Sequence, residues 1–380
     1  MTKYRLTPLR DTTKNKIRIM EKTRGSMESQ ALKTSKKQRP FVPILVTACM
    51  LILMVFLTGP YVYQALFMQQ NFTVEKVVFP QSAHDALYHA VYIDATNEFV
   101  YKKQDGFYSF DVAKKQEILL VAASNMSYSY AASEKWIVWG AAVNNEEKLH
   151  VFNRLTNEVK ILETDYFFDV HLQGDEIIYL ALKPIDGARS EVSYQKYNIL
   201  TEQSTIIQEI DVTSTSKTSF VDGNYMAISE QIEMEGGEKT IISVYDLQQS
   251  TNIGTYNIPY DIVKYISLYD RKIYAYVWHS NVEESGKIGV MDLETNRFTT
   301  LKSPVKVDDF ATDGQHFAVA VQKGESNSVQ LFEERDGQLK RISSLPTINE
   351  RLVLPRFTEA GTLVVTSEGP DRPIYLIRFK

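Results

Sequence analysis

The sequence has 380 residues, of which 44% are hydrophobic and 23% are charged. This balance is ordinary for a globular protein, and it excludes intrinsic disorder as the default state of the chain. The single cysteine, Cys49, excludes an intramolecular disulfide and any multi-cysteine metal cluster. The fold must therefore be held together by the packing of its core.

Charge divides the chain into three parts. Residues 1–40 hold twelve Lys and Arg against three acidic residues, residues 41–70 hold no charged side chain, and the remainder holds 30 basic and 44 acidic residues. We expect a basic cytoplasmic tail at 1–40, a membrane segment at 41–68 and a folded extracytoplasmic domain at 72–380. Beside a membrane segment, the basic tail is interpreted as an orientation signal and not as a nucleic-acid binding site.

The membrane segment begins with an uncharged stretch of 18 residues from Phe41 to Thr58. At about 1.5 Å per residue a helix of this length spans roughly 27 Å, close to the thickness of the hydrocarbon layer. Gly59-Pro60 marks a break before Tyr61 to Met68, which we expect at the far interface. The basic flank predicts a single-pass protein of the cell membrane, with the N-terminus in the cytoplasm.

Two processing alternatives stay open for this segment. Val46-Thr47-Ala48-Cys49 fits the short pattern that precedes a lipidated cysteine in bacterial lipoproteins, although the apolar run continues beyond it. Cleavage near Ala65 by a signal peptidase is the second alternative. The length of the apolar run favours an uncleaved anchor.

A repeat with a period of 41 to 48 residues follows the membrane segment. An apolar or aromatic residue followed by Asp, Asn or Glu ends a β-rich run six times: Phe110-Asp111, Phe152-Asn153, Tyr197-Asn198, Tyr245-Asp246, Met291-Asp292 and Phe332-Glu333. An Asp or Asn side chain at the start of a turn accepts hydrogen bonds from backbone N–H groups two residues ahead, which explains the pattern without a catalytic role. We interpret these sites as turns between strands.

A second series of turns alternates with the first, and strongly apolar strands follow each member of it. Together the two series give units of four short antiparallel strands, which is the pattern of a propeller blade. The predicted fold is therefore all-β, a β-propeller of seven blades with six or eight as alternatives, preceded by one transmembrane helix. The units cover residues 88–120, 126–163, 167–210, 216–257, 263–302, 306–344 and 350–380.

The last unit has only three strands before the chain stops at Lys380. The extra strand predicted from Phe72 to Phe79 would supply the missing outer strand and close the ring by pairing the two ends of the domain. Such closure leaves no exposed sheet edge at the junction.

The turn sequences Val290-Met291-Asp292-Leu293-Glu294-Thr295 and Val244-Tyr245-Asp246-Leu247 resemble the repeats of TolB-like propellers and of membrane-anchored propellers from Gram-positive bacteria. The resemblance covers residues 72–380 at the level of pattern. In that family the repeat residues are structural, so the resemblance implies a fold and carries over no active site.

Motifs for chemistry are missing from the sequence. The Gly-x-Ser-x-Gly elbow of propeller-bearing serine peptidases does not occur, and neither does a His-x-x-x-His pair or a glycine-rich phosphate loop. We therefore expect no cofactor and no metal site, and we name no catalytic residue.

Acidic residues are common in the loops expected between the second and third strands of the blades. These loops gather on one face of a propeller, and the candidate ligand-binding residues there are Glu146, Glu147, Glu233, Glu235, Glu283 and Glu284. Such a face would attract a cation, a basic protein segment or an amine-bearing polymer. The alternative is that these charges, with lysines interspersed, only keep the hairpin tips soluble.

Two functions remain open at this point. The first is a binding or scaffold module at the cell envelope, with an envelope protein or polymer as its partner. The second is an enzyme acting on an envelope glycan, lipid or peptide, which requires two carboxylates with separated pKa values in one pocket.

Overall fold

The computed structural model describes residues 72–143, 146–162, 166–186, 189–210, 216–234, 237–279, 286–323, 326–344, 352–368 and 371–380. The chain divides into two compact units, Met1–Gln70 and Asn71–Lys380, and all described residues belong to the second. The predicted basic tail (1–40) and membrane segment (41–68) lie outside the described residues. Among the residues that are described, no helix is both long and apolar enough to cross a membrane.

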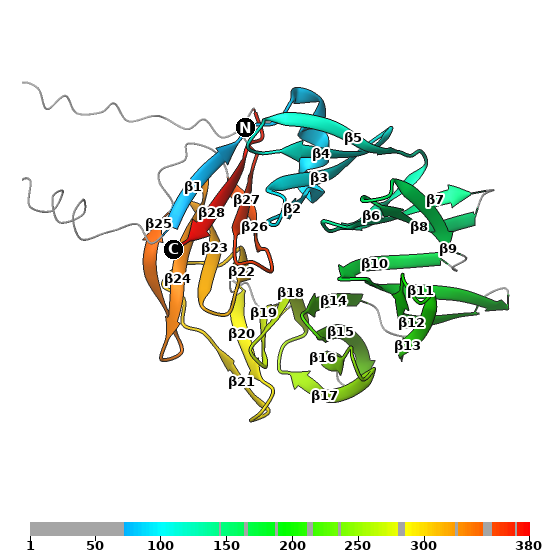
Figure 1. Ribbon diagram of the computed structural model, residues 1–380. Coiled ribbons are helices and arrows are strands. Elements are labelled where there is room, and N and C mark those ends of the chain that lie inside the picture. Colours follow the sequence, from blue (N-terminus) through cyan, green and yellow to red (C-terminus); the bar gives the residue numbers. More distant parts are fainter. Residues whose placement is uncertain are drawn as a thin grey trace, which may run out of the picture. The chain divides into compact units, whose positions relative to one another are not determined.

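Seven four-stranded antiparallel sheets are arranged around one axis, as Figure 1 shows, and this confirms the prediction of seven blades. Blade 1 consists of β2 (Val91–Ile93), β3 (Glu98–Lys103), β4 (Gly106–Asp111) and β5 (Gln116–Ala122), and blade 2 consists of β6 (Met126–Ala132), β7 (Trp136–Val143), β8 (Glu146–Asn153) and β9 (Glu158–Leu162). Blade 3 consists of β10 (Tyr166–Gln173), β11 (Glu176–Asp186), β12 (Arg189–Asn198) and β13 (Gln203–Ile210). Blade 4 consists of β14 (Ser216–Asp222), β15 (Tyr225–Met234), β16 (Gly237–Asp246) and β17 (Thr251–Ile258).

The remaining blades follow the same order. They are, in blade 5, β18 (Ile262–Tyr269), β19 (Lys272–Trp278), β20 (Lys287–Asp292) and β21 (Arg297–Thr300); in blade 6, β22 (Asp309–Thr312), β23 (His316–Lys323), β24 (Ser326–Arg335) and β25 (Gln338–Ser344); and in blade 7, β26 (Leu352–Phe357), β27 (Leu363–Ser367), β28 (Ile374–Phe379) and β1 (Phe72–Val77). One 3-10 helix, η1 (Gln81–His89), joins β1 to blade 1 and was not expected from the sequence.

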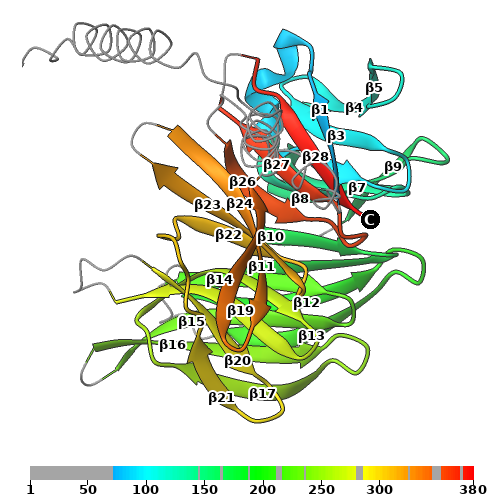
Figure 2. The same ribbon diagram turned by 90° about the vertical axis from the view of Figure 1, so that its left-hand side faces the viewer.

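Strand order within the blades gives the propeller two distinct faces. The innermost strands (β2, β6, β10, β14, β18, β22 and β26) surround the axis in Figure 1. The connections between the second and third strands all lie on one face, which we call the hairpin face. The turns between the first and second and between the third and fourth strands lie on the opposite face, the turn face. The C-terminus lies on the turn face (Figure 2).

The core consists of side chains packed between neighbouring blades. Strand β27 is buried at all five residues because both of its faces meet another blade, whereas the outer strand β5 is mostly exposed. One cluster joins Val138 of blade 2 to Phe167 and Ile177 of blade 3. Each fully buried apolar side chain of this size contributes about 1.5–3 kcal/mol to stability.

The ends of the described chain close the ring as predicted. Strand β1 pairs antiparallel with β28 in a continuous register from Phe72 opposite Phe379 to Val77 opposite Ile374. Phe72 and Val77 are both buried. The N-terminal strand is therefore the outer strand of blade 7.

The turns between third and fourth strands have the predicted chemistry. Asn153 Oδ1 accepts hydrogen bonds from the backbone N–H groups of Leu155 and Thr156, at 2.9 and 3.2 Å. Asp292 Oδ1 accepts in the same way from Glu294 and Thr295. These residues are structural, as the sequence pattern indicated.

Candidate functional site

Three of the six predicted acidic residues lie in described strands, at the hairpin face. Glu146 and Glu147 begin β8, and Glu233 lies opposite Glu238 near the end of β15. Glu235, Glu283 and Glu284 lie outside the described residues, and the side chains of Glu146 and Glu233 are not described. Glu147 is partly exposed. Whether these side chains form one acidic surface therefore stays a prediction.

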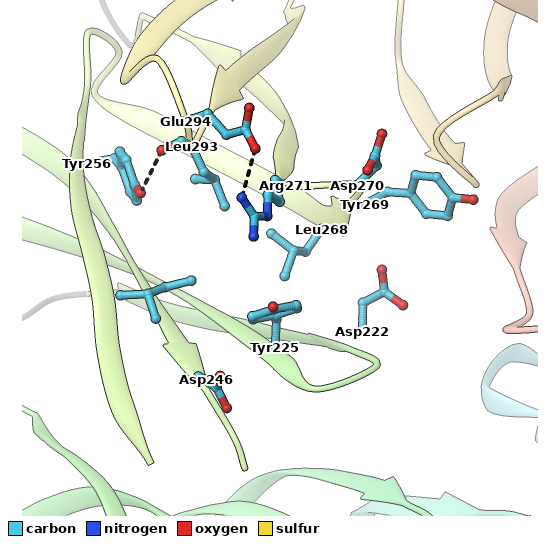
Figure 3. Close-up of a pocket in the computed structure, with 11 residues that line it drawn as sticks. Asp222, Tyr225, Asp246, Tyr256, Leu268, Tyr269, Asp270, Arg271, Leu293 and Glu294 are labelled. Atoms are coloured by element: carbon cyan, nitrogen blue, oxygen red, sulfur yellow. Dashed lines mark hydrogen bonds and ion pairs between the residues drawn. The ribbon is translucent and has the colours of Figure 1, made fainter. Parts of the chain in front are cut away.

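A pocket lies on the opposite, turn face, between blades 4 and 5. It has a volume of about 530 Å³, and Figure 3 shows its lining. Residues from the turns of both blades form it: Asp222, Tyr225, Asp246, Ile253 and Tyr256 from blade 4, and Leu268, Tyr269, Asp270, Arg271, Leu293 and Glu294 from blade 5.

Negative charge dominates this pocket. Four carboxylates line it, together with one cation, the guanidinium of Arg271. Arg271 Nη1 lies 2.8 Å from Glu294 Oε1, so the only cation in the lining is already paired with a carboxylate of the same lining. The remaining negative charge favours a positively charged ligand.

Three tyrosines also line the pocket. Tyr225 and Tyr269 are exposed, and Tyr256 is buried with its hydroxyl 3.4 Å from the carbonyl oxygen of Leu293, which accepts its hydrogen bond. This bond crosses from blade 4 to blade 5 (Figure 3). Exposed tyrosine rings beside carboxylates suit a cation, because the ring face is negative.

The environment of Asp222 disfavours its charged form. Burial, and then the negative charge of Glu359 in the blade 7 turn, raise the pKa of Asp222 above its ordinary value. A cation next to Asp222 would relieve both effects, because it stabilises the charged carboxylate.

The pocket wall is fixed by a close contact between blades 5 and 6. Gly314 of the first turn of blade 6 has a φ of +86° and lies against Tyr269, such that a Cβ at Gly314 would meet Tyr269 Cδ1 at 1.7 Å. Only glycine fits this position. Tyr269 therefore depends on a glycine of the next blade for its place in the pocket.

A group of Ser, His and Asp side chains elsewhere in the molecule tests the enzyme alternative. His171 Nε2 lies 2.7 Å from Ser219 Oγ and 3.3 Å from Asp169 Oδ1. In a catalytic triad the serine and the aspartate contact opposite nitrogens of the imidazole, whereas here both contact Nε2. Ser219 is also buried. The group acts as a polar link between blades 3 and 4.

Metal binding finds no support in this part of the chain. Within the described ranges no three His, Cys, Asp or Glu side chains are grouped closely enough to hold a metal ion. The pocket carboxylates come from four separate turns and do not form such a group.

The sequence did not predict the pocket. Its residues belong to turns that were interpreted as structural, including those around Asp222 and Asp270. Both turns combine an Asp with a Tyr nearby, which is a weak signal that becomes informative only once the two blades are known to be neighbours.

Comparison with known proteins supports the fold. No protein-family model matches the sequence, and no curated protein matches it. Among solved structures, oligogalacturonate lyase in complex with manganese has a TM-score of 0.53 at 11% identity, with 82% of this chain and 91% of that chain covered. The β-propeller domain of the Trilobed protease from Pyrococcus furiosus has a TM-score of 0.52 at 11% identity, with coverage of 72% and 88%.

A third similar structure is a chain of the mitotic checkpoint complex. It has a TM-score of 0.54 at 10% identity, and the match covers 81% of this chain and 95% of that chain. The Trilobed domain has an open velcro topology, whereas here β1 pairs with β28. Identities this low show the architecture alone. The described residues of this chain form a seven-bladed β-propeller.

Proposed function

We propose that this protein is a membrane-anchored binding module of the cell envelope, whose propeller takes an amine-bearing ligand in the pocket between blades 4 and 5. The observation that carries this proposal is a lining of four carboxylates in which the single cation, Arg271, is already paired. Lysine side chains of a basic protein segment and the amines of a polymer share the required chemistry. The proposed ligand class is the one predicted from the sequence. The proposed site is the pocket on the turn face, and not the acidic residues predicted on the hairpin face.

The sequence supplies the other part of the proposal. The uncharged stretch from Phe41 to Thr58, with its basic flank, favours a single-pass anchor with the propeller outside the cytoplasm. The turn pattern around Asp292 favours a relationship to TolB-like membrane-anchored propellers. An anchor ending at Met68 would be joined to the propeller at Phe72, the start of β1.

The enzyme alternative has less support. It requires an acid and a base close together, and the Ser219, His171 and Asp169 group lacks the geometry of a nucleophilic triad. In the pocket, the paired Arg271 and the Asp246 carboxylate, which accepts two backbone hydrogen bonds, have structural partners. A binding role needs only the charge and the ring faces that are present.

Isothermal titration of the full-length chain with trilysine, and with its acetylated neutral analogue, tests this function. We expect saturable binding of trilysine alone, weakened by salt because the attraction is electrostatic. The double variant Asp222→Asn/Asp270→Asn should bind about tenfold more weakly, equivalent to about 1.4 kcal/mol.

Glu147→Gln is the control, because it removes a negative charge from the hairpin face and leaves the pocket unchanged. We expect it to bind trilysine as the wild type does. Failure of trilysine to bind, or an equal loss in Glu147→Gln and in the pocket variant, would overturn the proposal.

A further inference from the structure

A row of aromatic side chains crosses the first two strands of blade 5. Tyr276 and Trp278 lie two residues apart in β19, so they share one face of the sheet, and their ring centroids are 5.1 Å apart. The ring of Tyr265, in the innermost strand β18, lies 6.2 Å from that of Tyr276. The three rings are therefore continuous, and we call them the aromatic row.

A β-bulge in β18 explains why Tyr265 belongs to this row. The bulge lies at Tyr265 and Ile266, and Tyr265 has a φ of 51°. This conformation costs a residue other than glycine about 1–3 kcal/mol, and bulges are frequent next to functional sites because they redirect side chains. Here Ile266 is buried in the core, whereas the Tyr265 side chain is 45% exposed.

Two contacts fix the central ring of the row. The Tyr276 hydroxyl donates a hydrogen bond of 3.1 Å to the carbonyl oxygen of Val307, directly before blade 6. Gly286 lies so close to the ring that a Cβ at this position would be 2.1 Å from Tyr276 Cζ. A ring that is held in place before binding lowers the entropy cost of taking up a ligand.

Charge is distributed unevenly along the row. At one end, the ammonium group of Lys264 lies 5.3 Å from the centre of the Trp278 ring. Lys264 is exposed, and within the part of the chain that the structure describes no carboxylate forms an ion pair with it. At the other end, burial and, to a smaller degree, the charges of Asp308 and Asp309 raise the pKa of Tyr276.

We propose that the aromatic row is a second binding site, for an acidic glycan. The C–H face of a sugar ring is apolar and slightly positive, so it packs against the negative face of an aromatic ring. The Lys264 ammonium group pairs with the carboxylate of the sugar, while Asp308 and Asp309 accept hydrogen bonds from its hydroxyl groups. The site shares no residue with the pocket between blades 4 and 5 and takes the opposite charge.

A single-stranded nucleic acid also combines rings with negative charge, but this surface suits it less. Such strands bind in grooves where several cations follow the phosphates. The aromatic row has one lysine and two neighbouring aspartates, and the chain beyond Gln70 has more acidic than basic residues. A glycan adds neutral hydroxyl groups to its carboxylate and therefore matches this mixture of charges.

Titration of the full-length chain with trimannuronate tests this site. Mannotriose has the same sugar rings without the carboxylates, and tricarballylate has three carboxylates without a ring. We expect saturable binding of trimannuronate, binding of mannotriose at least tenfold weaker, and no binding of tricarballylate. Hexathymidylate tests the nucleic-acid alternative and should not bind.

Two variants of exposed side chains separate the charge from the rings. Lys264→Gln should weaken trimannuronate binding about tenfold and leave mannotriose binding unchanged, whereas Tyr265→Ser should weaken the binding of both sugars about threefold to tenfold. Lys340→Gln is the matched control, because it removes an exposed lysine from the outer strand of blade 6. It should bind trimannuronate as the wild type does.

Tryptophan fluorescence locates the ligand. Trp136 and Trp139 are buried, whereas Trp278 is partly exposed, so trimannuronate should change the emission of the wild type but not that of Trp278→Phe. The proposal is contradicted if trimannuronate does not bind, or if mannotriose, tricarballylate or hexathymidylate binds equally well. Unchanged binding of trimannuronate in both Lys264→Gln and Tyr265→Ser would also contradict it.

Discussion

Arg378 of the last strand and Glu75 of the first strand form an ion pair, with Nη1 2.8 Å from Oε2. The same guanidinium donates through Nη2 to the Tyr92 hydroxyl and to Asn97 Oδ1 of blade 1. One side chain thus connects the two ends of the described chain to the neighbouring blade. Both partners of the ion pair are partly exposed, so most of the closure energy must come from β1 itself.

Removal of β1 should destabilise the whole propeller. A chain of residues 78–380 loses the buried Phe72 and Val77 and leaves the edge of β28 unpaired, whereas residues 71–380 retain the complete ring. We expect the shorter chain to lose several kcal/mol of unfolding free energy, at about 1.5–3 kcal/mol per buried apolar side chain. Urea unfolding of both chains measures the difference.

The Arg378→Met variant measures the contribution of the ion pair to stability separately from that of strand β1. We expect it to cost only about 1 kcal/mol, as for partly exposed polar contacts. Equal stability of the two truncated chains would show that β1 does not close the ring.

A buried ion pair joins blades 1 and 2. Arg154 Nη2 lies 2.5 Å from Glu98 Oε1, and Ser109 and Thr96 also donate to the Glu98 carboxylate. Burial raises the pKa of Glu98, but the hydrogen bonds from these partners lower it by more, so the net shift is downward. Glu98 therefore stabilises the folded state at pH values above the pKa that it has in the unfolded chain. This stabilisation is lost as the pH falls through the lower pKa that Glu98 has in the folded state.

Glu98→Gln and Arg154→Met should each lower the unfolding free energy by about 3 kcal/mol, because each leaves a buried group without its partner. The double variant should cost less than the two losses added together. Lys114→Met, which breaks the exposed pair with Asp111, should change stability little. Additive losses in the double variant would mean that the pair is not coupled.

Asp309 at the start of β22 should show the opposite pH dependence. Burial, then the charge of Asp308, raise its pKa to about 6. The folded state then holds a proton that the unfolded state releases, so Asp309 lowers stability as the pH rises from about 4 to about 6.

Asp309→Asn should therefore stabilise the protein at pH 7 by up to about 3 kcal/mol and have little effect below pH 4. Its amide oxygen can still accept the hydrogen bond from the Phe310 N–H. Thermal unfolding between pH 4 and pH 8 measures this, with the exposed Asp371→Asn as control. A variant less stable than the wild type at pH 7 would contradict the assignment.

Gly314→Ala tests the contact that holds Tyr269 in the pocket. The new Cβ would overlap the Tyr269 ring, so we expect a loss of about 1–3 kcal/mol from backbone strain and displacement of the ring. Gly337→Ala is the matched control, because Gly337 also has a positive φ, +72°, but open space around its Cβ position.

Only the Gly314 variant should also weaken the binding of trilysine, as measured by titration. Equal effects of the two variants on stability and on binding would show that the contact with Tyr269 does not shape the pocket.

The blade pattern was readable from the sequence because it depends on local chemistry. Asn153 and Asp292 determine turns through hydrogen bonds to residues two and three positions ahead, and such short-range signals repeat at each blade. The pairing of β1 with β28 was also predictable, because the last unit lacked one strand.

The pocket depends on contacts between blades, which the sequence does not encode locally. Asp222 and Asp270 are 48 residues apart in the sequence, and they line the same pocket only because their turns belong to neighbouring blades. Strand β18 contains a bulge at Tyr265, which has a positive φ. Because this residue is not a glycine, the sequence gives no sign of the bulge. Helix η1 was not predicted. Only its residues Ala83 and Leu87 are buried, in a cluster with side chains of blades 1 and 7, so the segment lacks a long helical pattern of apolar residues.

Carbodiimide coupling of bound trilysine to the full-length chain, followed by peptide mass mapping, tests the central claim most directly. This reaction joins an amine to a carboxylate that it contacts. The account predicts attachment at the pocket carboxylates Asp222, Asp246, Asp270 and Glu294. Attachment at Glu147, Glu233, Glu235, Glu283 and Glu284 instead, or evenly over the acidic surface, would contradict it.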